Sequence, residues 1–211
     1  TSPCGKIPAA ETVDYYAAHG YTGLVITDHL HPEFLAKVDE DHDWDHVVDL
    51  YMAGYRAAKK RGDEIGFDVL FGAEMRFPEN NNDYLVYDID ENWLRAHPYV
   101  ICQSAREFFE KYHNEVLVMH AHPYRDGNLT VFEDAVHGVE MINTNPRHNN
   151  WPDKPKTCVT CYINWKSSGF INKNRPKKSV WRVSISLNNC GKKTITASAH
   201  QKKRLNRLRT L

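Results

Sequence analysis

Three apolar stretches of the chain each lead into a residue that can bind a metal ion. The stretches span residues 24–26, 69–73 and 116–119, and their β-branched, apolar character indicates buried strands. The ligand-type residues that follow them are, in chain order, Asp28 and His29, then Glu74, then His120 and His122. In α/β barrels the C-terminal ends of the strands form the edge that holds the chemistry. We therefore expect a metal site at such an edge.

A divalent ion needs oxygen and nitrogen donors on rigid elements, with a position left open for substrate. We expect His29, Glu74 and His122 to supply these donors, and the two oxygens of Glu74 can bridge two ions. Asp28 can orient a ligating histidine or bind the ion directly. Arg125 follows closely after His122 and suits a phosphate held in a bidentate fork.

Each of these residues also has a purely structural interpretation. A single histidine at a strand end is usually a surface or capping residue. An aspartate after a strand is commonly a helix N-cap, and Glu74 can simply be solvated. The same placement at three strand ends is what favours a metal site.

The elements that must position these residues alternate between helix and strand. Helical spacing of apolar residues predicts helices at 8–19 and 44–62, and shorter ones near 90–96 and 103–113. Strands are predicted at 23–27, 67–73, 84–87, 115–119 and 138–142, with a long polar loop at 28–43. The repeating order β, α, β, α, β is typical of a parallel, helix-covered sheet or barrel.

The net charge of zero hides a division of the chain into two parts. Residues 1–153 hold all 27 acidic residues and 12 of the 27 basic ones, a balance of −15. Residues 154–211 hold 15 basic residues and no acidic one, a balance of +15. We therefore predict an α/β portion at 1–153 and a basic, poorly patterned segment at 154–211. Basic residues beside Trp and Tyr are typical of nucleic-acid-binding tails.

The lack of carboxylates after residue 153 has two explanations, a natural basic appendage or a shift of reading frame near that position. We favour the second, which predicts that residues 154–211 do not form a dense core. Alternating apolar residues still predict a strand at 180–187, and a further strand is possible at 158–165. Cys158 and Cys161, with Cys190 and His200, fit no compact zinc ribbon, so isolated cysteines are the better interpretation.

Composition argues against two other classes. No stretch reaches the roughly 20 apolar residues of a membrane-spanning helix, and no signal-peptide pattern is visible. Five cysteines are an odd number in a chain of 211 residues, so reduced thiols are expected rather than a disulfide framework. We predict a cytoplasmic protein with no membrane partner.

The motifs, taken in order, resemble those of a known family. Ile26-Thr27-Asp28-His29, Gly72-Ala73-Glu74 and Ala121-His122-Pro123-Tyr124-Arg125 resemble successive motifs of the PHP (polymerase and histidinol phosphatase) superfamily. Gly20-Tyr21 and the stretch 145–149 extend the resemblance over roughly residues 1–150. The run at 82–87 is most similar to that of the small bacterial PHP-domain phosphoesterases.

The resemblance implies a distorted, TIM-like (β/α)7 barrel, whose C-terminal end can be incomplete in this chain. It also implies two or three divalent ions (Zn, Mn, Fe or Mg) at the C-terminal face, where metal-activated water attacks a phosphoester. By resemblance, His29 binds one ion, Glu74 bridges two and His122 binds a second. Many members have a further histidine ligand where this chain offers Asp83 and Tyr84, so that assignment is open.

The remaining site residues follow from the same resemblance. His120 is expected as an extra imidazole beside the site. Arg125 and Arg147 are expected to bind the phosphate, and Arg125 with His148 to act in catalysis by binding the phosphate or protonating the leaving group.

Two family motifs are not intact in this chain. A His-x-His pair would end just before Thr1, and Ser198-Ala199-His200 lacks the aspartate of the last motif. We therefore expect impaired catalysis, with His29 the most isolated ligand while Glu74 and His122 keep each other.

The predicted function is that of a metal-dependent phosphoric ester hydrolase. Its substrate would be a phosphorylated small molecule, a nucleotide or an oligonucleotide, and the sequence does not choose among them. The alternative is a nucleic-acid-binding protein that uses the basic segment 154–211.

Overall fold

The computed structural model describes residues 5–123, 125, 127–128 and 135–140, and the backbone of two strands at 180–187 and 193–200. The helices are α1 (Ala9–Ala18), α2 (Pro32–Val38), α3 (Trp44–Ile65), α4 (Glu91–Ala96), the short 3₁₀ helix η1 (Val100–Cys102) and α5 (Ala105–Tyr112). The strands are β1 (Gly23–Leu30), β2 (Asp68–Arg76), β3 (Asp83–Tyr87), β4 (Leu117–His120), β5 (Gly138–Val139), β6 (Val180–Leu187) and β7 (Lys193–His200).

Five strands form one open sheet in the order β1-β2-β3-β4-β5. β1 pairs with β2 in parallel, and β4 pairs with β5 in parallel. β3 is antiparallel to both of its neighbours, so the fold is mixed α/β and the prediction of an all-parallel arrangement is wrong at β3. The physical reason is the short connection at 77–82, because a parallel crossover needs about a dozen residues or more.

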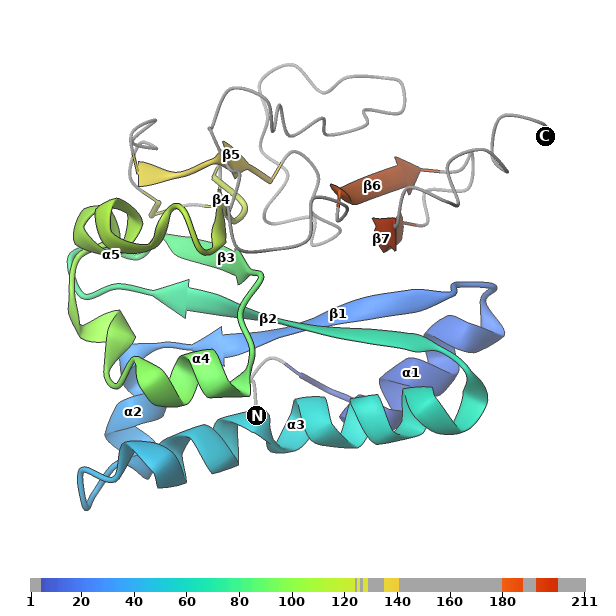
Figure 1. The fold of residues 1–211 in the computed structure, drawn as a ribbon, viewed down its shortest axis with the longest axis horizontal. Helices are drawn as coiled ribbons and strands as arrows, with labels where there is room; N and C mark the ends of the chain where they lie inside the picture. Colours follow the sequence, from blue (N-terminus) through green and yellow to red (C-terminus); the bar gives the residue numbers. More distant parts are fainter. Residues whose placement is uncertain are drawn as a thin grey trace.

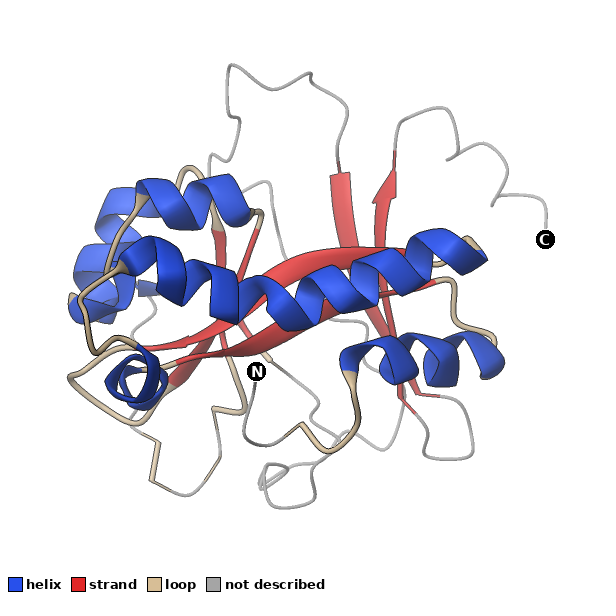
Figure 2. Cartoon of the chain, turned by 90° about the horizontal axis from the view of Figure 1, so that it is seen from below, coloured by secondary structure: helices blue, strands red, loops and turns tan. Residues whose placement is uncertain are grey.

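The helices cover one face of this sheet. In Figure 1, α1 and α3 run beneath β1 and β2, and Figure 2 shows the same helices in front of the strands when the molecule is seen from below. The apolar face of α3 supplies Val47, Val48, Tyr51 and Met52 to the main core. The Tyr51 and Tyr55 rings lie 6.2 and 5.1 Å from the ring of Phe71 in β2.

Strand alternation separates the two faces of the sheet. Ala73 and Met75 of β2 and Tyr84 and Val86 of β3 belong to the helix-covered core. Because successive side chains of a strand point to opposite faces, the side chain of Glu74 in β2 points away from the helices. His29 of β1 and Asp83 of β3 lie on the same face as Glu74.

Most predicted elements are confirmed, although several have other bounds than predicted. β1 and β2 each continue three residues further, to Leu30 and Arg76, so Asp28, His29 and Glu74 lie within the strands and not after them. The predicted loop at 28–43 contains α2, which Pro32 at its first turn and Glu33 beside it could have signalled. α3 continues to Ile65 and ends at Gly66, whose φ of 73° is left-handed, and not at Gly62. Ser104 is the N-cap of α5, and its side chain and that of Glu107 form a capping box.

The predicted strand at 180–187 is confirmed as β6, which pairs with β7 in antiparallel fashion. The other predicted strand of the basic segment, at 158–165, lies outside the described residues. None of the helices in the described ranges combines the length and the apolar character of a membrane-spanning segment.

Gly62 is required for close packing of α3 on the sheet. A Cβ at this position would lie 2.6 Å from the carbonyl oxygen of Phe67 and 2.6 Å from Cγ2 of Val69. Helix propensity alone predicts that Gly62→Ala stabilises the helix by about 1 kcal/mol. We expect the clash to reverse this sign and to lower the free energy of unfolding by about 1–3 kcal/mol, measured by urea denaturation.

The exposed Ala57 of the same helix provides the reference for propensity. Ala57→Gly should cost about 1 kcal/mol by propensity alone. A stabilised Gly62→Ala protein would show that α3 does not approach the strand this closely.

His137 gives the fold a dependence on pH. Its Nδ1 accepts the Val118 N–H at 3.0 Å, its Nε2 lies 3.2 Å from the His113 carbonyl, and burial lowers its pKa. The unfolded chain therefore binds more protons as pH falls below about 6.5, which destabilises the fold in acid. We expect a shallower pH dependence of the unfolding free energy between pH 7 and 5 in His137→Gln. Equal pH dependence in both proteins would contradict this role of the imidazole.

Candidate metal centre

The ends of four strands meet at one edge of the sheet. In the parallel pair β1–β2, His29 lies opposite Glu74, two residues before β2 ends. In the antiparallel pair β2–β3, Arg76 lies opposite Asp83, which is the first residue of β3. Because β3 runs antiparallel, its beginning lies where β1 and β2 end. β4 runs in the same direction as β2 and delivers His122 to this edge two residues after its last residue.

Glu74, Asp83 and His122 form a compact group of potential ligands. One ligand atom of each lies within 4.8 Å of those of the other two. His122 Nε2 lies 3.2 Å from Glu74 Oε1 and 3.4 Å from Asp83 Oδ2. Asp83 and His122 are buried, and the Glu74 side chain is 15% exposed. The structure thus brings two predicted ligands together and adds Asp83, whose assignment the sequence left open.

Of the three predicted ligands, His29 is the one outside the compact group, as expected, but it still contacts Glu74. Its Nε2 lies 3.3 Å from Glu74 Oε2, so the two oxygens of Glu74 face two different imidazoles. The His29 ring stacks on that of His31 with a centroid distance of 4.2 Å. His29 therefore belongs to the cluster through its contact with Glu74. It is not one of the three residues whose ligand atoms all lie close to one another.

The imidazoles decide the charge state of Glu74. Burial alone would raise the pKa of Glu74, but hydrogen bonds with His122 and His29 outweigh burial and hold it well below its ordinary value. Burial opposes protonation of His29, and the hydrogen bond with Glu74 outweighs it and raises the pKa of His29. The Glu74 carboxylate is therefore ionised across the physiological pH range and can act as a metal ligand.

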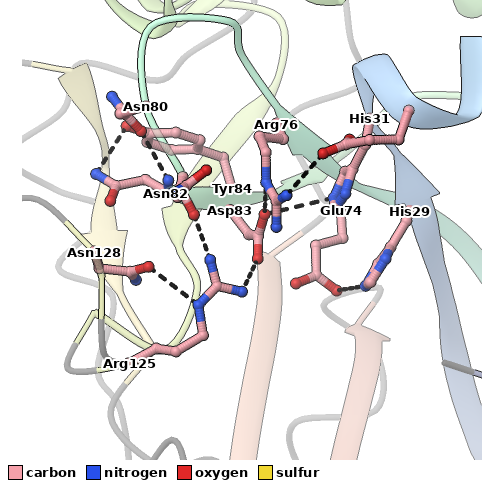
Figure 3. A network of polar contacts seen from close by, with 12 residues as sticks. His29, His31, Glu74, Arg76, Asn80, Asn82, Asp83, Tyr84, Arg125 and Asn128 are labelled. Atoms are coloured by element: carbon pink, nitrogen blue, oxygen red, sulfur yellow. Dashed lines mark hydrogen bonds and ion pairs between the residues drawn. The ribbon is translucent and has the colours of Figure 1, made fainter. Parts of the chain in front are cut away.

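The Asp83 carboxylate lies between two guanidinium groups, as Figure 3 shows. Arg76 Nε donates to Oδ1 at 2.8 Å, and Arg125 Nη1 donates to Oδ2 at 2.5 Å. Arg76 also donates to the exposed Glu33 of α2 at 3.3 Å. The sequence analysis missed Arg76, although a basic residue two positions after Glu74 on the same face of β2 is a signal that could have found it.

Arg125 is directed at protein acceptors in this structure. Besides Asp83, its guanidinium donates to the Asn81 carbonyl and, at 3.1 Å, to Asn128 Oδ1. These bonds tie the turn after β4 to the turn between β2 and β3. Contacts with described residues use three of its five N–H donors, so the predicted phosphate-binding role is compatible with these contacts.

His31 is a potential ligand from the polar loop predicted at 28–43, although the predicted metal site did not include it. Its side chain is 7% exposed, and its Nε2 has no hydrogen-bond partner but lies 3.5 Å from Asp83 Oδ1. Burial and the neighbouring His29 lower the pKa of His31 to about 4, so it is neutral at physiological pH. The spacing His29-x-His31 on one strand end is the signal that could have indicated it.

Two predicted site residues, Asp28 and His120, lie on the helix-covered face of the sheet and not on the face that carries Glu74. Asp28 pairs with Ala73 on the helix-covered face, where its carbonyl accepts the Tyr51 hydroxyl at 2.7 Å. His120 pairs with Tyr84 on the same face and stacks on its ring at 5.5 Å. His120 is fully buried, and neither of its ring nitrogens has a hydrogen-bond partner in the described part of the chain. Strand alternation thus turns the His120 ring toward the core, although it is still close enough to His122, Asp83 and Arg125 for their charges to act on its pKa. Its expected place beside the metal ligands stays a prediction.

Several residues named in the sequence analysis lie outside the described part of the chain: Arg147, His148, Tyr124, Cys158, Cys161 and Cys190. Of His200 only the backbone is described.

The donors of the cluster suit a hard or borderline divalent ion. Two carboxylates and one imidazole match the preferences of Mn²⁺, Fe²⁺, Zn²⁺ or Mg²⁺. Ion–ligand distances of about 2.0–2.3 Å place ligand atoms up to about 4 Å apart, so small side-chain adjustments would suffice. A buried imidazole nitrogen without a hydrogen-bond partner, in His31, lies beside them. The residues therefore fit a metal ion.

No protein-family model matches the chain, and no curated protein matches it.

Metal titration tests the cluster directly. We expect Glu74→Gln and His122→Gln each to weaken Co²⁺ or Mn²⁺ binding by roughly tenfold or more in isothermal titration calorimetry. Asp83→Asn should do the same, with thermal unfolding measured alongside because two arginines lose their carboxylate. The matched control is Glu33→Gln, a carboxylate bound to Arg76 but outside the cluster. Equal losses in the control would show that general surface charge, and not this cluster, binds the ion.

Proposed function

We propose that the protein is a metal-dependent phosphoric ester hydrolase of the PHP superfamily. The observation that carries this proposal is the convergence of Glu74, Asp83 and His122 at one sheet edge, with His29 against Glu74. Three of these four residues come from the motifs whose order resembles the family. The proposal includes the family's distorted (β/α)7 barrel, of which the open five-stranded sheet would be a part.

The described residues suggest a division of roles. Glu74, Asp83 and His122 would hold one ion, and His29 together with Glu74 would help to hold a further ion. A bound divalent ion supplies a water of lowered pKa and stabilises charge on the phosphoryl oxygens. Three protein ligands leave coordination positions open for that water and for substrate.

Arg125 would orient the substrate. Its guanidinium is held next to Asp83 by fixed acceptors, and its remaining N–H donors can bind a phosphoryl oxygen. Arg147 and His148 remain proposed phosphate-binding and leaving-group residues from the resemblance alone. The substrate class stays a phosphorylated small molecule, a nucleotide or an oligonucleotide.

No described contact favours the alternative of nucleic-acid binding. The basic side chains that motivated it lie in the segment 154–211, of which the structure describes only two strands of backbone.

Hydrolysis of p-nitrophenyl phosphate and bis(p-nitrophenyl) phosphate with Mn²⁺ tests the proposal. We expect slow, metal-dependent turnover that EDTA abolishes and that Glu74→Gln lowers by roughly 100-fold or more. Glu11→Gln, on the exposed side of α1, serves as the control with unchanged rate. Turnover that survives EDTA or Glu74→Gln would refute the proposal, and the ratio of the two rates assigns monoester or diester preference.

A further inference from the structure

His122 has a backbone conformation that is unusual for a residue with a side chain. Its φ is +31°, in the left-handed region that non-glycine residues seldom adopt. Three other non-glycine residues in the described ranges have positive φ, namely His42, Asp88 and Tyr99, and none of them belongs to the metal-ligand group. Strained backbone at a candidate ligand calls for a cause and for something that maintains it.

The left-handed turn changes the face of the sheet to which His122 belongs. β4 ends with His120, whose side chain lies on the helix-covered face against Tyr84. A strand continuing in extended conformation would place residue 122 on that same face. The His122 ring instead contacts Glu74 and Asp83, so the backbone at this residue redirects the ring to the metal cluster.

Hydrogen bonds hold the peptide groups on both sides of His122. Its backbone N–H donates to Glu140 Oε2 at 2.8 Å. Its carbonyl accepts from Asn128 Nδ2 at 3.0 Å and from the Arg125 N–H at 2.9 Å. Asn128 and Arg125 are visible beside the cluster in Figure 3.

Glu140 is itself firmly placed. It follows β5 directly, and its own N–H donates to the His120 carbonyl at 2.8 Å, which extends the pairing of β5 with β4. A charged acceptor makes a shorter and stronger hydrogen bond than a neutral one, particularly at a buried residue. His122 is only 6% exposed, so this bond is shielded from water.

We propose that Glu140 is a positioning residue of the metal centre. By accepting the His122 N–H, its carboxylate keeps the backbone of His122 left-handed and the ring turned toward Glu74 and Asp83. The value of this arrangement for catalysis rests on the proposed function, whereas the hydrogen bond and the orientation do not. Glu140 is not in the group of mutually close ligand atoms, so it acts through His122 and not on the ion.

Two substitutions separate this role from direct ligation. Glu140→Gln keeps an oxygen that accepts the His122 N–H, whereas Glu140→Ala removes it. We expect Glu140→Ala to weaken Co²⁺ binding by roughly tenfold and to change the visible Co²⁺ spectrum as His122→Gln does. Glu140→Gln should bind Co²⁺ almost as the wild type does. Glu115→Ala is the control, because Glu115 accepts an N–H from Trp93 at 3.4 Å, away from the cluster.

Amide hydrogen exchange of His122 provides a readout that needs no metal. In the presence of a chelator, we expect protection in the wild type and in Glu140→Gln, and exchange at least about tenfold faster in Glu140→Ala. If this pattern holds while the wild type binds no Co²⁺, the positioning role stands and the proposed function fails. Equal exchange in wild type and Glu140→Ala would overturn the positioning role. So would a loss of Co²⁺ affinity in Glu140→Gln as large as in Glu140→Ala.

Discussion

The burial of the Asp83 carboxylate is the constraint on which the candidate site depends. A carboxyl group that is only 1% exposed is stable only when opposite charges and hydrogen-bond donors surround it. Arg76 and Arg125 meet its two oxygens, and the imidazoles of His31 and His122 lie within 3.5 Å. These partners come from β2, from the end of β1 and from the turn after β4. The carboxylate thereby fixes the relative positions of all three.

The same arrangement keeps the cluster from carrying a net negative charge. The two acids, Glu74 and Asp83, are matched by two guanidinium groups, and the neutral His31 adds none. A divalent ion added to this set leaves a positive site, which would attract a phosphate. The charge arrangement is thus consistent with the proposed chemistry without depending on the identity of the substrate.

The two faces of the sheet divide the work between stability and chemistry. The helix-covered face packs Tyr51, Phe71 and Met75 into a continuous apolar core, which keeps the strands rigid. The opposite face carries the polar cluster near one edge. The backbone of His122 joins the two, because it leaves a strand whose last side chain is in the core and presents its own ring to the cluster.

The sequence alone determined the types of the candidate ligands, the existence of most helices and strands, and the placement of His29 and Glu74 on successive strands. Local patterns suffice for this, since apolar runs and capping residues act over a few positions. Only the tertiary structure decided that β3 is antiparallel, which brings Asp83 to the edge where β1 and β2 end. It also decided that His120 lies in the core while His122 faces the cluster. Strand direction and side-chain face depend on pairing between distant segments and on one left-handed residue, and neither is encoded in a local pattern of residue types.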